Sequence, residues 1–218
     1  MRVPYLNNKQ QTLAKLCLLG ISAALISACS ATAVKIDDIF PAPLIAPLPA
    51  HIGVHFSDKL VGYIHEEEVE ANGSWRIEVG SAQHSMFKQI LSGMFVRTTP
   101  VPGPDNFASI DMPLDAILVP EVVDFQFSIP AQTRTPFYEV WIKYEISLYQ
   151  PSGDLIKKWP LTAYGKANTD NYGFLQRTRE PAVQEATRIA LRDAAAFFAL
   201  RFSREVEIQS WITQLEDS

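Results

Sequence analysis

The sequence lacks a basic block, a long apolar run and the motifs of common enzymes, and each absence excludes a class of function. Its 19 basic residues are scattered among 24 acidic ones, so no cluster is available to neutralise nucleic-acid phosphates. The apolar run over residues 16–26 is shorter than the roughly 20 residues that a membrane-spanning helix needs. We therefore expect neither nucleic-acid binding nor a helix that spans the membrane in the mature protein.

Catalytic motifs are also missing. There is no Gly-x-Ser-x-Gly elbow, no phosphate-binding glycine loop and no dinucleotide fingerprint. Ser85 and Lys88 have the Ser-x-x-Lys spacing of penicillin-binding enzymes, but the companion Lys-Thr-Gly and Ser-Asp-Asn motifs are absent, and Phe87 between them belongs to an apolar helix face. We predict a protein that is not an enzyme and that needs no cofactor.

The four histidines do not have the spacing of metal ligands. His51 and His55 share one face of a predicted strand but lie about 13 Å apart at roughly 3.3 Å per residue, whereas ligand atoms sit about 2 Å from a metal. His65 precedes Glu66–Glu68, a pattern typical of a solvated acidic strand end, and His84 falls in the first turn of a predicted helix. We predict no metal site.

What the sequence does contain is an N-terminal targeting segment. Residues 1–15 carry Arg2, Lys9 and Lys15 and no acid, and the apolar run over residues 16–26 follows directly. This order is typical of an export signal, which is removed from the mature protein.

The segment ends in Ile26-Ser27-Ala28-Cys29, which resembles the lipobox of bacterial lipoproteins. The resemblance implies cleavage before Cys29, attachment of diacylglycerol to its sulfur and acylation of the new amine, with chains such as palmitate. Two or three chains suffice for a stable membrane anchor. Ser30 follows where an aspartate would favour the inner membrane, which implies an outer-membrane anchor with the domain in the periplasm. The alternative is a plain secretory signal with a chance cysteine.

Cleavage would leave Cys29 as the only cysteine, because Cys17 leaves with the signal. No internal disulfide and no second thiol is then available. The 16 basic residues that remain against 24 acidic ones give a net charge of −8, which favours solubility rather than attraction to anionic lipid. We predict a signal peptide over 1–28, a lipidated Pro-rich tether over 29–50 and a single α+β periplasmic domain over 51–218.

The tether assignment depends on four prolines within residues 41–49. Proline at this density precludes a helix or a central strand. Proline-rich segments are extended at about 3.1 Å per residue, so we expect this segment to set the distance between the domain and the membrane. Alternatively, Leu44, Ile45 and Leu48 pack on the domain surface.

Within the domain, hydrophobic periodicity alternates between 2 and 3.6 residues. Asn72-Gly73 is a strong hairpin signal, Ser81 can cap a helix, and Pro181 suits a first helical turn. Pro120 interrupts an otherwise strand-like segment, so we expect an edge position or a bulge there. The patterns predict strands over 52–56, 61–69, 75–79, 116–129, 138–149 and 155–167, and helices over 81–95 and 181–202. The predicted fold is α+β, a largely antiparallel sheet with two helices packed on it, in the order β-β-β-α-β-β-β-α.

This element order, with the lipobox before it and Ala194–Ala196 in the last helix, resembles the small envelope lipoproteins of Gram-negative bacteria, of the lipopolysaccharide-assembly and transport-auxiliary types. The resemblance covers most of residues 50–205 and includes no diagnostic motif beyond the lipobox. It implies a lipid-anchored accessory protein of an envelope complex.

Aromatic residues in the long hairpin provide the candidate binding surface. Trp141 and Tyr149 lie on the polar face of the clearest strand, and Trp159 and Tyr164 lie across the hairpin from it. Exposed aromatic residues are favoured anchors of protein interfaces. The other interpretation, in which a helix covers this face and the four residues are core, stays open.

We expect a non-catalytic accessory or assembly factor of an envelope transport or secretion complex, which docks a partner through its sheet or a sheet edge. One alternative is a binding module for an envelope lipid or glycan, which should show an enclosed apolar pocket of roughly a few hundred Å³. A less favoured alternative is a hydrolase with an unconventional site, which should show converging titratable groups in a cleft.

Overall fold

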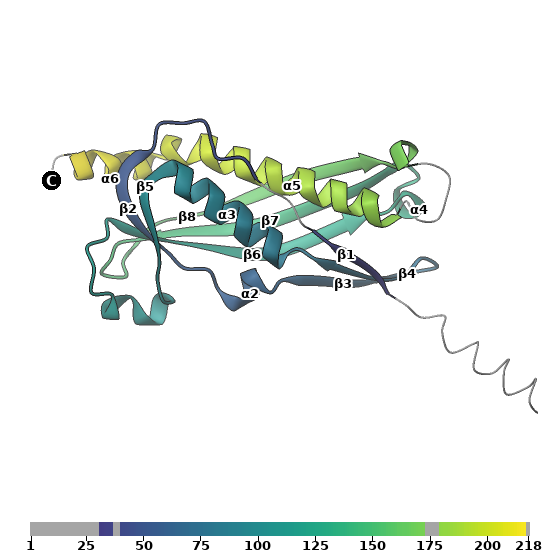
Figure 1. Cartoon of the computed structure of the whole chain (residues 1–218), viewed down its shortest axis with the longest axis horizontal. Coiled ribbons are helices and arrows are strands. Elements are labelled where there is room, and N and C mark those ends of the chain that lie inside the picture. The colour runs from purple at the N-terminus through teal and green to yellow at the C-terminus, as the bar shows by residue number, and fades with distance from the viewer. Residues whose placement is uncertain (1–30, 37–39, 173–178, 217–218) are drawn as a thin grey trace, which may run out of the picture.

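The computed structural model describes residues 31–36, 40–172 and 179–216. Eight strands and a set of helices follow one another along these ranges (Figure 1). In chain order they are β1 (Thr32–Lys35), β2 (Leu48–Val54), α2 (Asp58–Val61), β3 (Ile64–Val69), β4 (Gly73–Glu78), α3 (Gly80–Met94), β5 (Phe95–Pro100), the 3-10 helix η2 (Pro104–Ser109), β6 (Ala116–Ser128), α4 (Pro130–Thr133), β7 (Phe137–Tyr149), β8 (Leu155–Asn168), η3 (Thr169–Tyr172), α5 (Arg179–Arg201), η5 (Phe202–Arg204) and α6 (Val206–Glu216).

The strands form two mixed sheets, so the prediction of one largely antiparallel sheet is wrong. The larger sheet has the order β5-β2-β6-β7-β8, and the smaller has the order β1-β4-β3. β2 runs parallel to both β5 and β6, and β1 runs parallel to β4, whereas the β3–β4, β6–β7 and β7–β8 pairs are antiparallel. The cause is the β3–β4 hairpin: it leaves the large sheet, and α3 then returns the chain so that β5 starts beside β2 in the same direction.

The expected elements exist, and further ones accompany them, among which are β1, β5 and α6. β1 comes from residues 32–35, which the sequence placed in the tether, and it pairs with residues 75–78 of β4. β5 follows α3 directly, and α6 ends the described chain. Helix α3 starts at Gly80 without a side-chain cap from Ser81, so the proposed cap is wrong.

Pro120 lies at a position of β6 where a residue without a backbone N–H is tolerated. β2 pairs only with Ala116–Leu118 of β6. Among the described strands, β6 therefore has no partner on that side at Pro120, where a missing N–H is tolerated. The bulge in β6 lies further on, between Val122 and Asp124.

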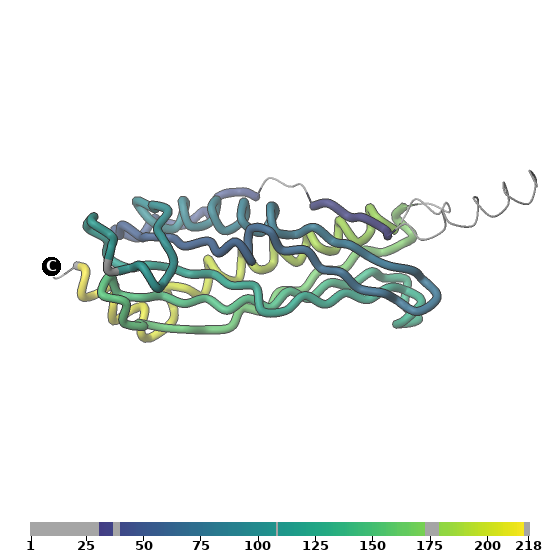
Figure 2. The backbone as a smooth tube through the Cα atoms, turned by 90° about the horizontal axis from the view of Figure 1, so that it is seen from below, coloured from purple at the N-terminus to yellow at the C-terminus, as the bar shows by residue number. Residues whose placement is uncertain are grey.

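Helices α3 and α5 pack on one face of the large sheet, and the small sheet closes the core beside them (Figures 1 and 2). The small sheet meets β6 through rings of His65 and Phe125, whose centroids are 4.8 Å apart. Helix α5 approaches β8 so closely that a Cβ built on Gly165 would lie 2.1 Å from the Ala186 carbonyl oxygen. Small residues at a spacing of four turn toward this contact on α5: Ala182, Ala186, Ala190 and Ala194, all fully buried.

A buried polar chain links the layers. The Tyr144 hydroxyl on β7 donates to Gln83 Oε1 on α3 at 2.9 Å, and Gln83 Nε2 donates to the Leu60 carbonyl of α2 at 2.5 Å. Burial, and secondarily the charge that Tyr63 would carry, raises the pKa of Tyr144 far above its ordinary value. None of the helices within the described ranges is long and apolar enough to cross a membrane.

Candidate partner-docking face

Side chains of β6, β7 and β8 line up in rows on the face of the large sheet opposite α3 and α5. The registers place Gln126, Trp141 and Tyr164 side by side across the three strands. Beside them lies a second row, Asp124, Lys143 and Thr162, and on the other side a third row, Ser128, Glu139 and Lys166. The three rows form a flat patch, which we call the outer face, that combines an aromatic centre with charges of both signs.

The Trp141 and Tyr164 rings form the centre of the outer face. Their centroids are 5.2 Å apart with an interplanar angle of 38°, within the range in which aromatic pairs attract each other. A shallow hollow of about 260 Å³ adjoins the pair and is lined by Trp141 together with Asp124, Gln126 and Thr162. Both rings are partly exposed, so a partner could cover them.

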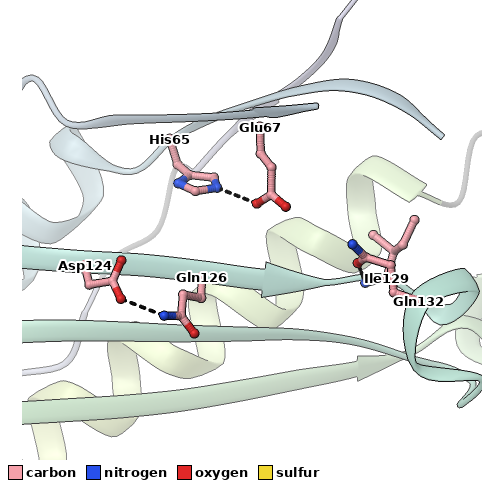
Figure 3. Close-up of polar contacts among 6 residues, drawn as sticks. All are labelled: His65, Glu67, Asp124, Gln126, Ile129 and Gln132. Atoms are coloured by element: carbon pink, nitrogen blue, oxygen red, sulfur yellow. Dashed lines mark hydrogen bonds and ion pairs between the residues drawn. The ribbon is translucent and has the colours of Figure 1, made fainter. Parts of the chain in front are cut away.

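Hydrogen bonds hold the polar groups around the aromatic pair. The Tyr164 hydroxyl donates to Glu139 Oε1 at 2.5 Å, and partial burial together with this bond raises the pKa of Tyr164 to about 12. Gln126 Nε2 donates to Asp124 Oδ2 at 2.7 Å (Figure 3). The Lys166 ammonium lies 4.8 Å from the centroid of the Phe137 ring, a cation–π distance. These contacts fix the patch before any partner arrives.

The structure brings together only two of the four aromatic residues that the sequence nominated. Trp159 packs inside the core, where its ring stacks on Phe198 of α5 at 6.2 Å. Tyr149 lies on the outer side but contacts Phe107 of η2 in a separate apolar cluster at the other end of the sheet. Whether Trp141 and Tyr164 bind a partner stays a prediction.

The polar neighbours of this pair were not among the predicted site residues. Glu139 and Lys143 could have been found by the alternation along β7, which already placed them beside Trp141. Gln126 and Thr162 needed the strand registers, which periodicity does not supply.

The open edge of β8 is partly closed to a partner strand. The Tyr164 backbone N–H points away from β7 and donates to Asp193 Oδ2 of α5 at 3.1 Å. Pro160 lies four residues earlier, with the same parity, and has no N–H to offer. Such features protect an edge strand from pairing, so the outer face is a better docking surface than this edge.

Each histidine has a contact within the fold. His51 Nε2 lies 2.9 Å from Thr99 Oγ1, and His55 Nδ1 lies 3.2 Å from the Val101 carbonyl oxygen. The ring of His84 packs edge-on against Phe56 at 4.7 Å, and burial, with a smaller effect of the Lys88 charge, lowers the pKa of His84.

His65 points from β3 toward β6 and lies 3.0 Å from Glu67 Oε2 (Figure 3). Among the residues that the structure describes, no group of three or more His, Cys, Asp or Glu side chains could hold a metal ion.

The remaining candidates are far from the outer face or outside the described residues. Ser85 and Lys88 lie on the exposed side of α3, with Phe87 buried between them. Ile26, Ser27, Ala28 and Cys29 lie outside the described residues, so cleavage and lipidation stay predictions.

No family model matches the sequence, and no curated protein matches it. The fold is similar to several solved bacterial structures at low identity. A Xanthomonas campestris protein of the family DUF330 is 12% identical, with a TM-score of 0.49 over 87% of this chain and 98% of that one. A minor lipoprotein of Acinetobacter baumannii is also 12% identical, with a TM-score of 0.42 over 73% of this chain and 94% of that one. A Caulobacter crescentus structure described as a lipoprotein is 14% identical, with a TM-score of 0.34 over 50% of this chain and 77% of that one.

Proposed function

We propose that this protein is a lipid-anchored, non-catalytic accessory subunit of an envelope transport or secretion complex, and that it docks its partner through the outer face. The observation that carries the docking proposal is the Trp141–Tyr164 pair, whose rings are both partly exposed on the sheet face opposite α3 and α5. Aromatic residues are enriched at interfaces, and mixed charges around them give a partner its orientation. The anchor follows from the lipobox and Cys29.

The structure changes the expected mechanism of anchoring. Thr32, the third residue after Cys29, is already in β1 and pairs with Trp75. Three residues span at most about 11 Å, so lipid on Cys29 would hold this end of the domain close to the outer membrane. The proline-rich segment follows β1 rather than preceding the fold, and it joins two strands of the domain. Position on the membrane would then come from β1, and partner choice from the outer face.

Site-specific photocrosslinking in intact cells tests the proposal. A photoreactive residue at Thr162, in the hollow beside Trp141, should capture one envelope protein. Capture should fall when Trp141→Ala and Tyr164→Ala are combined, and when Cys29→Ala removes the anchor. The matched control is a photoreactive residue at Val206, which is 71% exposed but lies on α6.

Two results would count against the proposal. Equal capture from Thr162 and Val206 would mean that the outer face has no particular partner. Identical membrane fractionation of the Cys29→Ala variant and the wild type would remove the anchor and, with it, the assignment to the outer membrane.

A further inference from the structure

A cavity of about 540 Å³ lies on the helix side of the molecule, away from the outer face. The segment over residues 40–47, which leads into β2, passes over α5 (Figure 1). Residues 40–43 of this segment form one wall of the cavity, Ile90 of α3 contributes a second, and Ala195, Ala196 and Ala199 of α5 a third, with Arg192 beside them. The volume lies within the range of small-molecule binding pockets, roughly 300–1,000 Å³.

The wall formed by residues 40–43 is held in place by the fold. Phe40 is only 2% exposed and belongs to the core. Pro43 lies on Gly93 of α3 so closely that a Cβ there would come within 2.7 Å of the proline ring. The cavity is therefore preformed and does not require a folding step before it can accept a ligand.

Among the described residues that line the cavity, every side chain except that of Arg192 is apolar. Every residue from 40 to 50 has an apolar side chain, and Pro41 and Pro43 also lack a backbone N–H. An extended peptide or a glycan would find few side-chain partners here, and each donor or acceptor that it buried without a partner would cost about 1–3 kcal/mol. A hydrocarbon chain has no such groups, so the walls favour it over both.

Arg192 is the one charged side chain among the described residues that line the cavity. Its guanidinium has five N–H donors, so it can hold a partner within the protein and still donate to an anion. The combination of an apolar cavity and one cation matches a long acyl chain that ends in a carboxylate or a phosphate.

Two exposed apolar residues follow the wall that residues 40–43 form. Leu44 is fully exposed and Ile45 is 37% exposed. They add apolar surface next to this wall in the chain.

We propose that this cavity binds a single acyl chain of an anionic lipid, with the chain between residues 40–43 and α5 and the acidic head group at Arg192. The site is separate from the outer face, because α5 and Trp141 lie on opposite sides of the large sheet. If the lipid-binding proposal fails, the docking proposal is unaffected. If the docking proposal fails, the lipid-binding proposal is likewise unaffected.

Photolabelling of membranes from cells that make the full chain tests this inference. The probe is a palmitic acid analogue that carries a diazirine near the end of its chain. After irradiation and trypsin digestion, the label should concentrate in the peptides that form the cavity, residues 36–59, 89–97 and 193–201. Ala196→Phe fills the cavity from the exposed side of α5 and should abolish this labelling. Leu200→Phe, on the same helix and 57% exposed, is the matched control and should leave the labelling intact.

The head-group contact and the source of the chain have their own measurements. Arg192→Gln should weaken competition by palmitate about tenfold, the effect of losing one charge-assisted hydrogen bond, and should not change competition by methyl palmitate. If palmitate competes and phosphatidylglycerol vesicles do not, the ligand is a free fatty acid. The opposite result identifies a phospholipid.

Three outcomes would overturn the inference. They are labelling spread evenly over the chain, labelling unchanged by Ala196→Phe, and a lack of competition by either lipid. Trp141→Ala should leave labelling unchanged, because it alters only the outer face.

Discussion

Neighbouring residues of β7 lie in two different environments. Ile142 and Tyr144 have no exposed surface and face the helices. Trp141 and Lys143, which alternate with them along the strand, lie on the outer face. The helix side is defined by shape: Gly165 and the alanines of α5 allow the helix backbone to approach the sheet. The outer face is defined by pairs of side chains across strands. The first arrangement determines stability, and the second is free to serve recognition.

If this contrast is correct, the largest effect comes from adding volume where α5 meets β8. Gly165→Val places atoms on the Ala186 carbonyl, so either α5 or β8 must move. Overpacking of this kind costs about 3 kcal/mol or more, measurable as a lower urea midpoint in tryptophan fluorescence. Thr162→Val adds the same side chain on the exposed side of β8. An equal loss for both variants would contradict the contrast.

A comparison of adjacent positions on β7 tests the contrast between the two sides of the large sheet more sharply. Ile142→Ala removes a fully buried side chain and should cost about 3 kcal/mol. Lys143→Ala, one residue later on the outer face, should change stability by no more than about 0.5 kcal/mol. The free energies of unfolding of the two variants provide the measurement. If Lys143→Ala costs as much as Ile142→Ala, the outer face is covered in the folded protein.

The buried Tyr144 predicts an effect at alkaline pH. Its pKa is raised in the folded state, so the unfolded chain loses the phenolic proton first, and stability should fall as the pH rises above about 10. Tyr144→Phe should make this fall shallower. At neutral pH the same variant should cost about 1–2 kcal/mol, because it leaves Gln83 Oε1 without its donor. Urea midpoints at pH 7 and pH 10.5 separate the two effects, and an unchanged pH slope would contradict the assignment.

The sequence was sufficient for the elements whose signals are local. The alternation from Tyr138 to Leu148 correctly separated the two sides of β7. Asn72-Gly73 correctly located the β3–β4 turn, where Ala71 and Gly73 have positive φ angles. Helices α3 and α5 begin and end within a few residues of their predicted limits.

Strand partners could not be predicted, because periodicity reports which face a residue occupies and not which strand lies beside it. β1 has only residues 32–35 to reveal it and pairs with residues 75–78 of β4, far along the chain. The parallel β2–β5 pair likewise depends on where α3 returns the chain, and the parallel β2–β6 pair depends on the segment with η2 that joins β5 to β6. This is why the mixed topology was missed.

For the candidate site, strict use of the two-residue strand period would have excluded Trp159 from the predicted binding surface. Trp159 and Tyr164 are five positions apart, so one strand must place them on opposite faces. Tyr149 has the parity of Trp141, but η2 covers it through Phe107, and no local signal in the sequence announces that contact.

The smallest expected effect concerns the aromatic pair itself. Trp141→Ala and Tyr164→Ala, alone and combined, form a double-mutant cycle whose coupling energy should be about 0.5–1 kcal/mol. A coupling in this range means that the two rings attract each other but are not needed for folding, as a recognition surface requires. A coupling of several kcal/mol would mean that the pair supports the sheet. In that case a loss of partner capture in the Trp141→Ala, Tyr164→Ala variant would report misfolding. The test of docking would then need Thr162→Lys in place of the double variant, because Thr162→Lys adds bulk and charge to the hollow without removing either ring.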